Sequence, residues 1–182
     1  MAVDADLVKR FNAGDVEAFA ELYRRYFGLI RSYHFVLLRQ TELAENLAQE
    51  TFLRAFQAAP RLPVDHFKPW LFMIARHLAI DEARRRKRQR TVSLESVARV
   101  LPSGEASDPA AGALRGEARR RTATILAELP RHYQELLLLR DLFGLSYDEI
   151  GQAMGLSREA VKSALHRARL DFRRRYAESE GR

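Results

Sequence analysis

The sequence of 182 residues lacks cysteine and has no long hydrophobic run. Without cysteine the chain can form neither a disulfide nor a thiolate zinc site, which fits a reducing cytosol. The longest apolar stretch, residues 70–75, is far shorter than the roughly 20 residues that a membrane-spanning helix needs. Two acidic residues precede the first basic one, unlike a secretory signal. We therefore predict a soluble cytoplasmic protein without membrane insertion.

Acidic side chains are the minority among the charged residues. The chain has 24 aspartates and glutamates and 31 lysines and arginines, which gives a net charge of +7 and an isoelectric point near 10.1. This balance favours a polyanionic partner. Hydrophobic residues make up 47% and charged residues 30%, which is typical of a globular protein and excludes a wholly disordered chain.

Charge and composition divide the chain into three parts. Residues 1–90 carry 16 basic and 11 acidic side chains, residues 91–113 carry one and three, and residues 114–182 carry 14 and 10. The middle part contains two prolines and two glycines among serines and alanines, in the stretch LPSGEASDPAAG. Such a segment has little to bury. We predict two basic domains, 1–90 and 114–182, joined by a flexible linker over 91–113.

Apolar residues recur at spacings of three and four in both domains, which predicts an all-α protein without strands. For the first domain we expect four helices. A short helix lies around residues 7–11, and Asp15 caps a helix over 16–39. Pro69 opens a long helix that reaches the basic run at 84–90. A third helix covers 41–58, and its inner side is expected to contain Leu43, Leu47, Phe52, Ala55 and Phe56.

The second domain ends in a sequence typical of a helix-turn-helix. Helices are expected over 114–129 and 133–143, ended by Pro130 and Gly144. In the stretch that follows, Ser146 and Glu149 form a capping box, Gly155 breaks the chain, and Ser157 caps the next helix. The shared apolar seam is expected to contain Ile150, Met154, Leu156, Val161, Leu165 and Ala168.

A helix-turn-helix directs the outer face of its second helix to base edges in the major groove, while arginines bind phosphates. An ordinary helical hairpin with a polar outer face would give a similar pattern, but the order of cap, break and cap is more demanding. We predict DNA binding by Ser157, Arg158, Glu159, Lys162, Ser163, His166, Arg167 and Arg169.

The run RRRKRQR at 84–90 covers the whole circumference of a helix, so it cannot be only the solvent-exposed face of an amphipathic helix. We expect two i,i+4 ion pairs, Asp81 with Arg85 and Glu82 with Arg86. The remaining basic side chains of this run indicate nucleic-acid binding rather than mere contact with solvent. Just before this run, His66 and Phe67 are candidates for contact with an unpaired base, whereas Trp70 is expected to be buried. The basic side chains without an acidic partner at i,i+4 are Arg84, Lys87, Arg88 and Arg90.

No motif for catalysis or for a cofactor is present. His77 and Asp81 lie four residues apart and could share a metal, but no third ligand is in register. No serine or threonine lies in a nucleophile motif, and there is no glycine-rich phosphate loop. We therefore predict a non-catalytic protein without metal or cofactor.

Three stretches of this sequence resemble bacterial sigma factors of the extracytoplasmic-function (ECF) group. The stretch ELAENLAQETFLRAF resembles the polymerase-binding helix of that group, and FKPWLFMIARHLAIDEARRRKR resembles its promoter-melting and −10 helix. The stretch LAELPRHYQELLLLRDLFGLSYDEIGQAMGLSREAVKSALHRARLDFRR resembles its −35 domain. The resemblance implies that residues 1–90 are sigma region 2 and that residues 114–182 are sigma region 4.

The same resemblance implies the partners. They are promoter DNA, core RNA polymerase through its β′ clamp and β flap, and a separate anti-sigma protein. Contacts to the polymerase clamp would come from Glu45, Asn46, Leu47, Gln49, Glu50 and Phe52. Contacts to the −10 element and the melted strand would come from His66, Phe67, Lys68, Arg76, His77, Arg84, Arg85, Lys87 and Arg88.

Four positions depart from the usual pattern of the group. Asn46 stands where an acid is common and His77 where Asn is common, while Ala160 and Ala164 replace Thr and Arg. Asn46 cannot make a charge-assisted bond to a basic clamp, and Ala164 cannot bind a phosphate. Two other functions are alternatives. One is a free-standing repressor or activator whose first domain dimerises or senses a ligand. The other is a nucleic-acid-processing enzyme, which would need a metal-binding carboxylate cluster that the sequence does not show.

Overall fold

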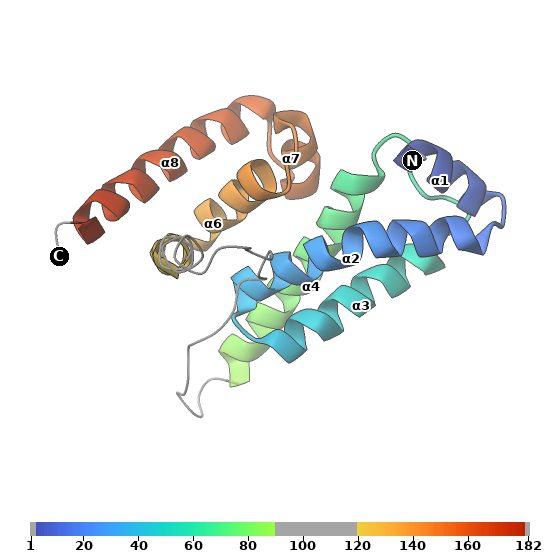
Figure 1. The fold of residues 1–182 in the computed structure, drawn as a ribbon, viewed down its shortest axis with the longest axis horizontal. Helices are drawn as coiled ribbons and strands as arrows, with labels where there is room; N and C mark the ends of the chain where they lie inside the picture. The colour runs from blue at the N-terminus through green and yellow to red at the C-terminus, as the bar shows by residue number, and fades with distance from the viewer. Residues whose placement is uncertain (1–2, 90–119, 181–182) are drawn as a thin grey trace, which may run out of the picture.

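The computed structural model describes residues 3–89 and 120–180, and every regular element in these ranges is a helix (Figure 1). The predicted all-α class is therefore confirmed. The predicted linker, 91–113, lies outside the described residues. The elements are α1 (Asp4–Asn12), α2 (Val16–Leu38), α3 (Thr41–Gln57), α4 (Phe67–Gln89), a helical stretch over 120–128, α6 (Arg131–Leu137), the π-helical turn η1 (Leu138–Leu142), α7 (Tyr147–Met154) and α8 (Arg158–Glu180).

The predicted caps are present. The Asp15 carboxylate accepts hydrogen bonds from the backbone amides of Glu17 and Ala18 at 3.1 and 3.3 Å, and α2 begins there. At α7 the Ser146 amide donates to the Glu149 carboxylate at 2.7 Å while the Glu149 amide donates to the Ser146 hydroxyl at 3.2 Å. Because these interactions are local in sequence, they fix the start of each helix independently of its neighbours.

Helices α1 to α4 form the first module, whose core is rich in aromatic side chains. Helix α2 packs along α3, and α4 and α1 pack against this pair. Phe52 of α3 lies against Tyr23 of α2, with ring centroids 4.8 Å apart, and the Phe11 ring packs against Phe19 with centroids 4.6 Å apart. Of the predicted inward row of α3, Phe52 and Ala55 are buried, but Phe56 is 43% exposed, and Ala44 and Ala48 are buried instead.

Residues 120–180 form the second module, in which α6 and α7 both pack on α8. The predicted seam is buried except at Leu156, which is 40% exposed, so that part of the prediction is wrong. Gly155 has a left-handed φ of 69° and turns the Leu156 side chain away from the seam. The helix predicted over 133–143 ends in η1, whose wider turn leaves Leu138, Leu139 and Phe143 buried and Leu142 exposed.

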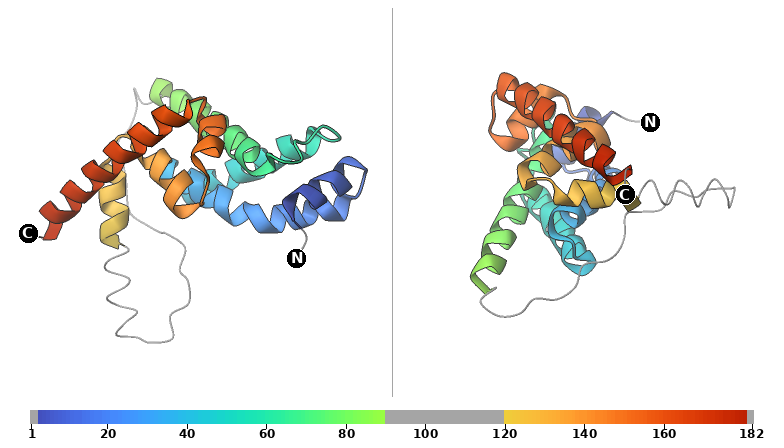
Figure 2. Two further views of the ribbon diagram at one scale, coloured as in Figure 1. Left: turned by 90° about the horizontal axis from the view of Figure 1, so that it is seen from above. Right: turned by 90° about the vertical axis from the view of Figure 1, so that its left-hand side faces the viewer.

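The two modules lie against each other, α4 against α7 and α2 against α6 (Figure 2). Phe143 of the second module packs against Phe72 of α4, with ring centroids 5.0 Å apart. Long helix α8 runs along the outer side of the second module and away from the first (Figures 1 and 2). None of the helices within the described ranges is long and apolar enough to span a membrane.

Candidate nucleic-acid interface

The first turns of α8 present a polar face to solvent and an apolar face to α7. Val161, Leu165 and Ala168 are buried, which fixes the rotation of the helix about its axis. The side chains between them therefore point outward. The ones that the sequence predicts for DNA binding are exposed at Ser157, Arg158, Glu159, Lys162, Ser163, His166 and Arg167 and half-buried at Arg169.

Two of these cations are held by acids on neighbouring elements. The Arg158 guanidinium lies 2.5 Å from the carboxylate of Asp148, on α7. Arg169 donates to Asp141 of η1 at 2.6 Å, and this bond raises the pKa of Arg169 above its ordinary value. The sequence did not predict either acid partner, because they come from other helices. The pairs orient both guanidinium groups in advance, and leave Lys162 and His166 as the central exposed groups of the face.

The second predicted surface, on α4, is only partly accessible. His66, His77, Arg84, Arg85 and Arg88 are exposed. Phe67, predicted to touch a base, is buried against Tyr26 with ring centroids 5.8 Å apart, so it acts in the core. Trp70, expected to be buried, is only half-buried and is the better candidate for stacking. Helix α4 begins at Phe67 rather than at the predicted Pro69, so Phe67 belongs to the helix and not to the loop before it.

Two further cations of this surface, Lys68 and Arg76, contact the second module. Lys68 Nζ donates to the backbone carbonyl of Phe143 at 2.7 Å. Arg76 Nε lies 3.0 Å from the Glu135 carboxylate. The structure therefore brings together α4 and α6, which belong to the two separate domains predicted from the sequence.

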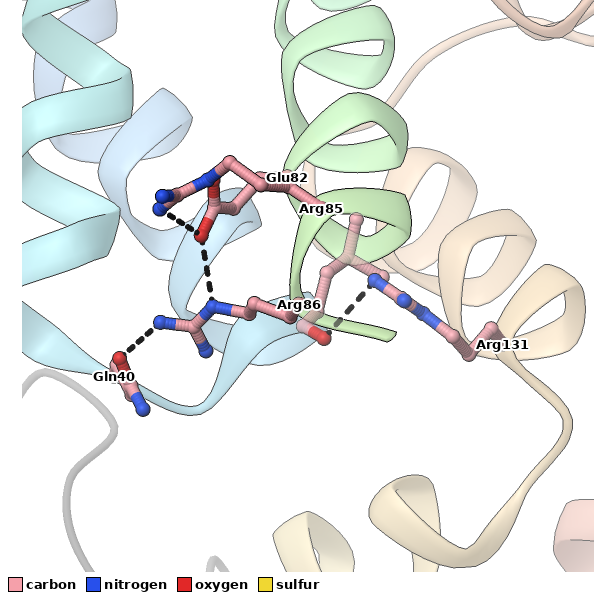
Figure 3. A network of polar contacts seen from close by, with 6 residues as sticks. Gln40, Glu82, Arg85, Arg86 and Arg131 are labelled. Atoms are coloured by element: carbon pink, nitrogen blue, oxygen red, sulfur yellow. Dashed lines mark hydrogen bonds and ion pairs between the residues drawn. The ribbon is translucent and has the colours of Figure 1, made fainter. Parts of the chain in front are cut away.

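The basic end of α4 is organised by one acid, Glu82 (Figure 3). This carboxylate is 8% exposed and accepts from Arg85 at 2.7 and 2.9 Å and from Arg86 at 2.8 Å. These bonds, that of Arg85 first, hold the pKa of Glu82 below its ordinary value. Arg86 also donates to the Gln40 side chain. The predicted pair of Asp81 with Arg85 is wrong, since Asp81 lies 3.9 Å from Arg84 instead.

On α3, the predicted polymerase-binding residues divide into a surface group and a core residue. Asn46 and Gln49 are exposed, while Glu45, Leu47 and Glu50 are half-buried. Glu50 pairs with Arg54 at 2.8 Å. Phe52 is 3% exposed and enclosed by aromatic rings of α2. Phe52 thus packs α3 onto α2, and a contact of its ring with the polymerase stays a prediction.

His34 is a fully buried histidine between α2 and α3. Its Nε2 lies 3.3 Å from the Thr51 hydroxyl, which in turn donates to the Leu47 carbonyl at 2.7 Å. Its Nδ1 has no hydrogen-bond partner among the described residues. Burial disfavours the charged imidazolium and lowers the pKa of His34 to about 3.

We expect the stability of the first module to fall in mild acid because of His34. The unfolded chain protonates this residue near its ordinary pKa of about 6.5, whereas the folded chain does so near 3. The contribution is therefore complete above pH 6.5 and is lost as the pH falls from 6.5 toward 3. Urea unfolding should give a free energy about 2 kcal/mol lower at pH 5 than at pH 8. The exposed-histidine variant His77→Gln should keep this pH dependence, and His34→Gln should lack it; an unchanged dependence in His34→Gln would contradict the assignment.

The fold and the exposed face of α8 define a helix-turn-helix DNA-binding protein, with a second helical module packed beside it. Comparison with known proteins gives the family. The family described as Sigma-70 region 2 matches residues 22–89, and the family described as Sigma-70, region 4 matches residues 119–172.

Relatives match along most of the chain. ECF RNA polymerase sigma factor SigM of Bacillus subtilis is 32% identical over 149 residues, which cover 82% of this chain and 89% of that protein. RNA polymerase sigma factor CarQ of Myxococcus xanthus is 31% identical over 162 residues, which cover 88% and 90%. This chain belongs to the ECF group of the sigma-70 family, and its function is promoter recognition and transcription initiation with core RNA polymerase.

Solved structures agree with this fold. CnrH, in complex with the cytosolic domain of CnrY, superposes with a TM-score of 0.64 at 25% identity and covers 93% of this chain and 94% of that chain. The sigma factor RpoE of Bartonella quintana, in complex with the anti-sigma factor NepR, gives a TM-score of 0.70 at 24% identity and covers 86% and 94%.

Proposed function

We propose that the two modules divide the promoter between them. Residues 114–182, which contain the second module, read the upstream −35 element with the exposed face of α8. Residues 1–90, which contain the first module, hold the opened −10 strand with α4 and bind core polymerase through α3. The chain works in the cytoplasm as a non-catalytic specificity subunit. Unstacking a base requires a few kcal/mol, which strand stacking and the polymerase can offset.

One observation carries this proposal: the rotation of α8. Its three buried residues, Val161, Leu165 and Ala168, are spaced so that the groups between them form one continuous exposed stripe. Lys162, Ser163 and His166 line an open groove on this stripe together with Arg167. A helix fits the major groove, and such a stripe at its N-terminal half is what direct readout requires.

Lys162→Ala is expected to weaken binding of the −35 element by the reconstituted polymerase. The loss of a contact from this position should cost about 1–3 kcal/mol, a factor of about 5 to 150 in affinity. The measurement is promoter occupancy by footprinting, on matched promoters with and without an intact −35 element. The same change at exposed Lys9 of α1 should leave occupancy unchanged. Equal occupancy by the Lys162→Ala and unmodified proteins would remove this residue from the interface.

A separate anti-sigma protein is a further proposed partner. Its support is the similarity over both modules to CnrH, which was solved with the cytosolic domain of CnrY, and to RpoE of Bartonella quintana, which was solved with NepR. Purification of the tagged chain from its own cells should recover such a protein in a complex that lacks polymerase. Addition of that protein to the holoenzyme should then stop transcription.

A further inference from the structure

We propose that Glu159 selects a cytosine in the −35 element by accepting a hydrogen bond from the N4 amino group of that base. This role rests on the proposed function for the docking of α8 in the major groove. It goes further by naming a base that the exposed face of α8 prefers and the residue that selects it.

Glu159 is an acidic side chain on a surface that is otherwise neutral or basic. It lies in the first turn of α8 and lines the same open groove as Lys162, Ser163 and His166. None of the other described residues that line this groove is acidic. Because like charges repel, a carboxylate at this position weakens the attraction to DNA phosphates. Phosphate binding therefore does not account for it.

The carboxylate of Glu159 is available to a ligand, unlike those of the acids nearby. Asp148 is paired with Arg158 at 2.5 Å, and Asp141 is paired with Arg169 at 2.6 Å. Glu159 is exposed and makes no hydrogen bond or ion pair with any residue that the structure describes. Nor is it needed to cap α8, because the Ser157 hydroxyl accepts from the Ala160 amide at 3.2 Å. Both carboxylate oxygens of Glu159 can therefore accept hydrogen bonds from DNA.

A carboxylate only accepts hydrogen bonds, and this decides which base it can select. In the major groove guanine presents the acceptors N7 and O6, and thymine presents the acceptor O4, all of which repel a carboxylate. Adenine presents an N6 amino group beside the acceptor N7, whereas cytosine presents its N4 amino group without a neighbouring acceptor. Cytosine is therefore the base that the carboxylate of Glu159 favours.

Few other side chains on this face can distinguish one base from another. Ala160 is exposed and Ala164 is half-buried, and neither has a polar group in its side chain. Lys162 only donates hydrogen bonds, so it favours the acceptors O6 and N7 of guanine. Residues three apart on a helix lie on the same face. Glu159 and Lys162 thus offer an acceptor for cytosine beside a donor for guanine.

Selection from a promoter library with a randomised −35 element tests this role, with the full chain bound to core polymerase. The unmodified chain should enrich cytosine at one position of the element. Glu159→Gln should enrich adenine there, because an amide both donates and accepts and so matches N6 and N7 of adenine. Glu159→Ala should lose the preference at that position and keep the others. Replacement of this cytosine should lower the affinity of the unmodified chain about 5- to 150-fold, and that of Glu159→Ala less than about twofold.

The matched control is Glu178→Gln, which removes the same charge from an exposed position on α8 outside the groove. It should leave every base preference unchanged, and circular dichroism should show the same helix content in all variants. A carboxylate that acts only through its charge repels all sequences alike. Unchanged base preferences in Glu159→Gln and Glu159→Ala, with only a uniform rise in affinity, would therefore overturn the selection of cytosine and leave the docking of α8 intact. A library in which the unmodified chain enriches no base of the −35 element would overturn the docking itself.

Discussion

Replacement of Gly151 by valine is expected to disrupt the helix-turn-helix and to abolish −35 recognition. A Cβ atom at this position would lie 2.6 Å from the backbone carbonyl oxygen of Leu156, a distance that carbon and oxygen do not tolerate. The obstacle is backbone and cannot rotate away as a side chain would. We expect a loss of about 3 kcal/mol in the free energy of unfolding, at the upper end of overpacking effects.

The hydrogen bonds of the turn explain why Leu156 cannot shift to make room for a Cβ atom at position 151. The Leu156 amide donates to the Gly151 carbonyl at 3.0 Å, and the Gly155 amide donates to the same oxygen. A shift of Leu156 that admits a Cβ would break these bonds and tilt α8 against α7. DNA affinity should therefore fall even in molecules that remain folded.

The matched control is Gly28→Val in α2. Gly28 is exposed in a helix of the first module, and an added Cβ meets nothing within 4 Å. Since valine and glycine have similar helix propensities, its free energy of unfolding should change by less than about 0.5 kcal/mol. Urea unfolding and footprinting of both variants would check the assignment. Similar losses in both would show that the contact with Leu156 is unimportant.

The requirement for glycine at position 151 could not be predicted from the sequence. Gly155 could be predicted as a turn because it follows a capped helix of ordinary length, and its positive φ confirms this. Gly151 lies inside that helix, where a glycine has no local signature. Its necessity comes from the return of the chain after Gly155, which places Leu156 against it. The capping box of Ser146 and Glu149 was predictable for the opposite reason, since its two partners lie within three residues of each other.

The burial of aromatic side chains could be predicted only in part. Periodicity placed both Phe52 and Phe56 on the inner side of α3, yet one is 3% and the other 43% exposed. The difference depends on where α2 crosses α3, and small residues such as Ala48 allow close approach there. Ion pairs were likewise predictable only where they are local. The pair of Glu82 with Arg86 lies within one helix and was predicted, whereas the pair of Arg76 with Glu135 depends on the packing of two modules.

Phe52→Ala is expected to have the largest effect in the first module, through stability rather than through a lost partner contact. The Phe52 ring lies 4.8 Å from Tyr23 and 6.2 Å from both Phe19 and Phe27, measured between centroids. Removal of a buried phenyl ring leaves a cavity and should lower the free energy of unfolding by about 3–5 kcal/mol. Core polymerase binding should fail because α3 is no longer held in place.

Three further variants separate an effect on stability from the loss of a polymerase contact. Phe56→Ala, on the next turn of α3, removes a half-exposed ring and should lower the free energy of unfolding by less than about 2 kcal/mol. Glu50→Arg should leave the module folded but impair core binding, since it reverses a surface charge on α3. Phe52→Leu, which keeps an apolar side chain in the core, should recover most of the stability and with it core binding. A Phe52→Leu protein that is as stable as the unmodified chain but binds polymerase as poorly as Glu50→Arg would show that the ring itself contacts the polymerase.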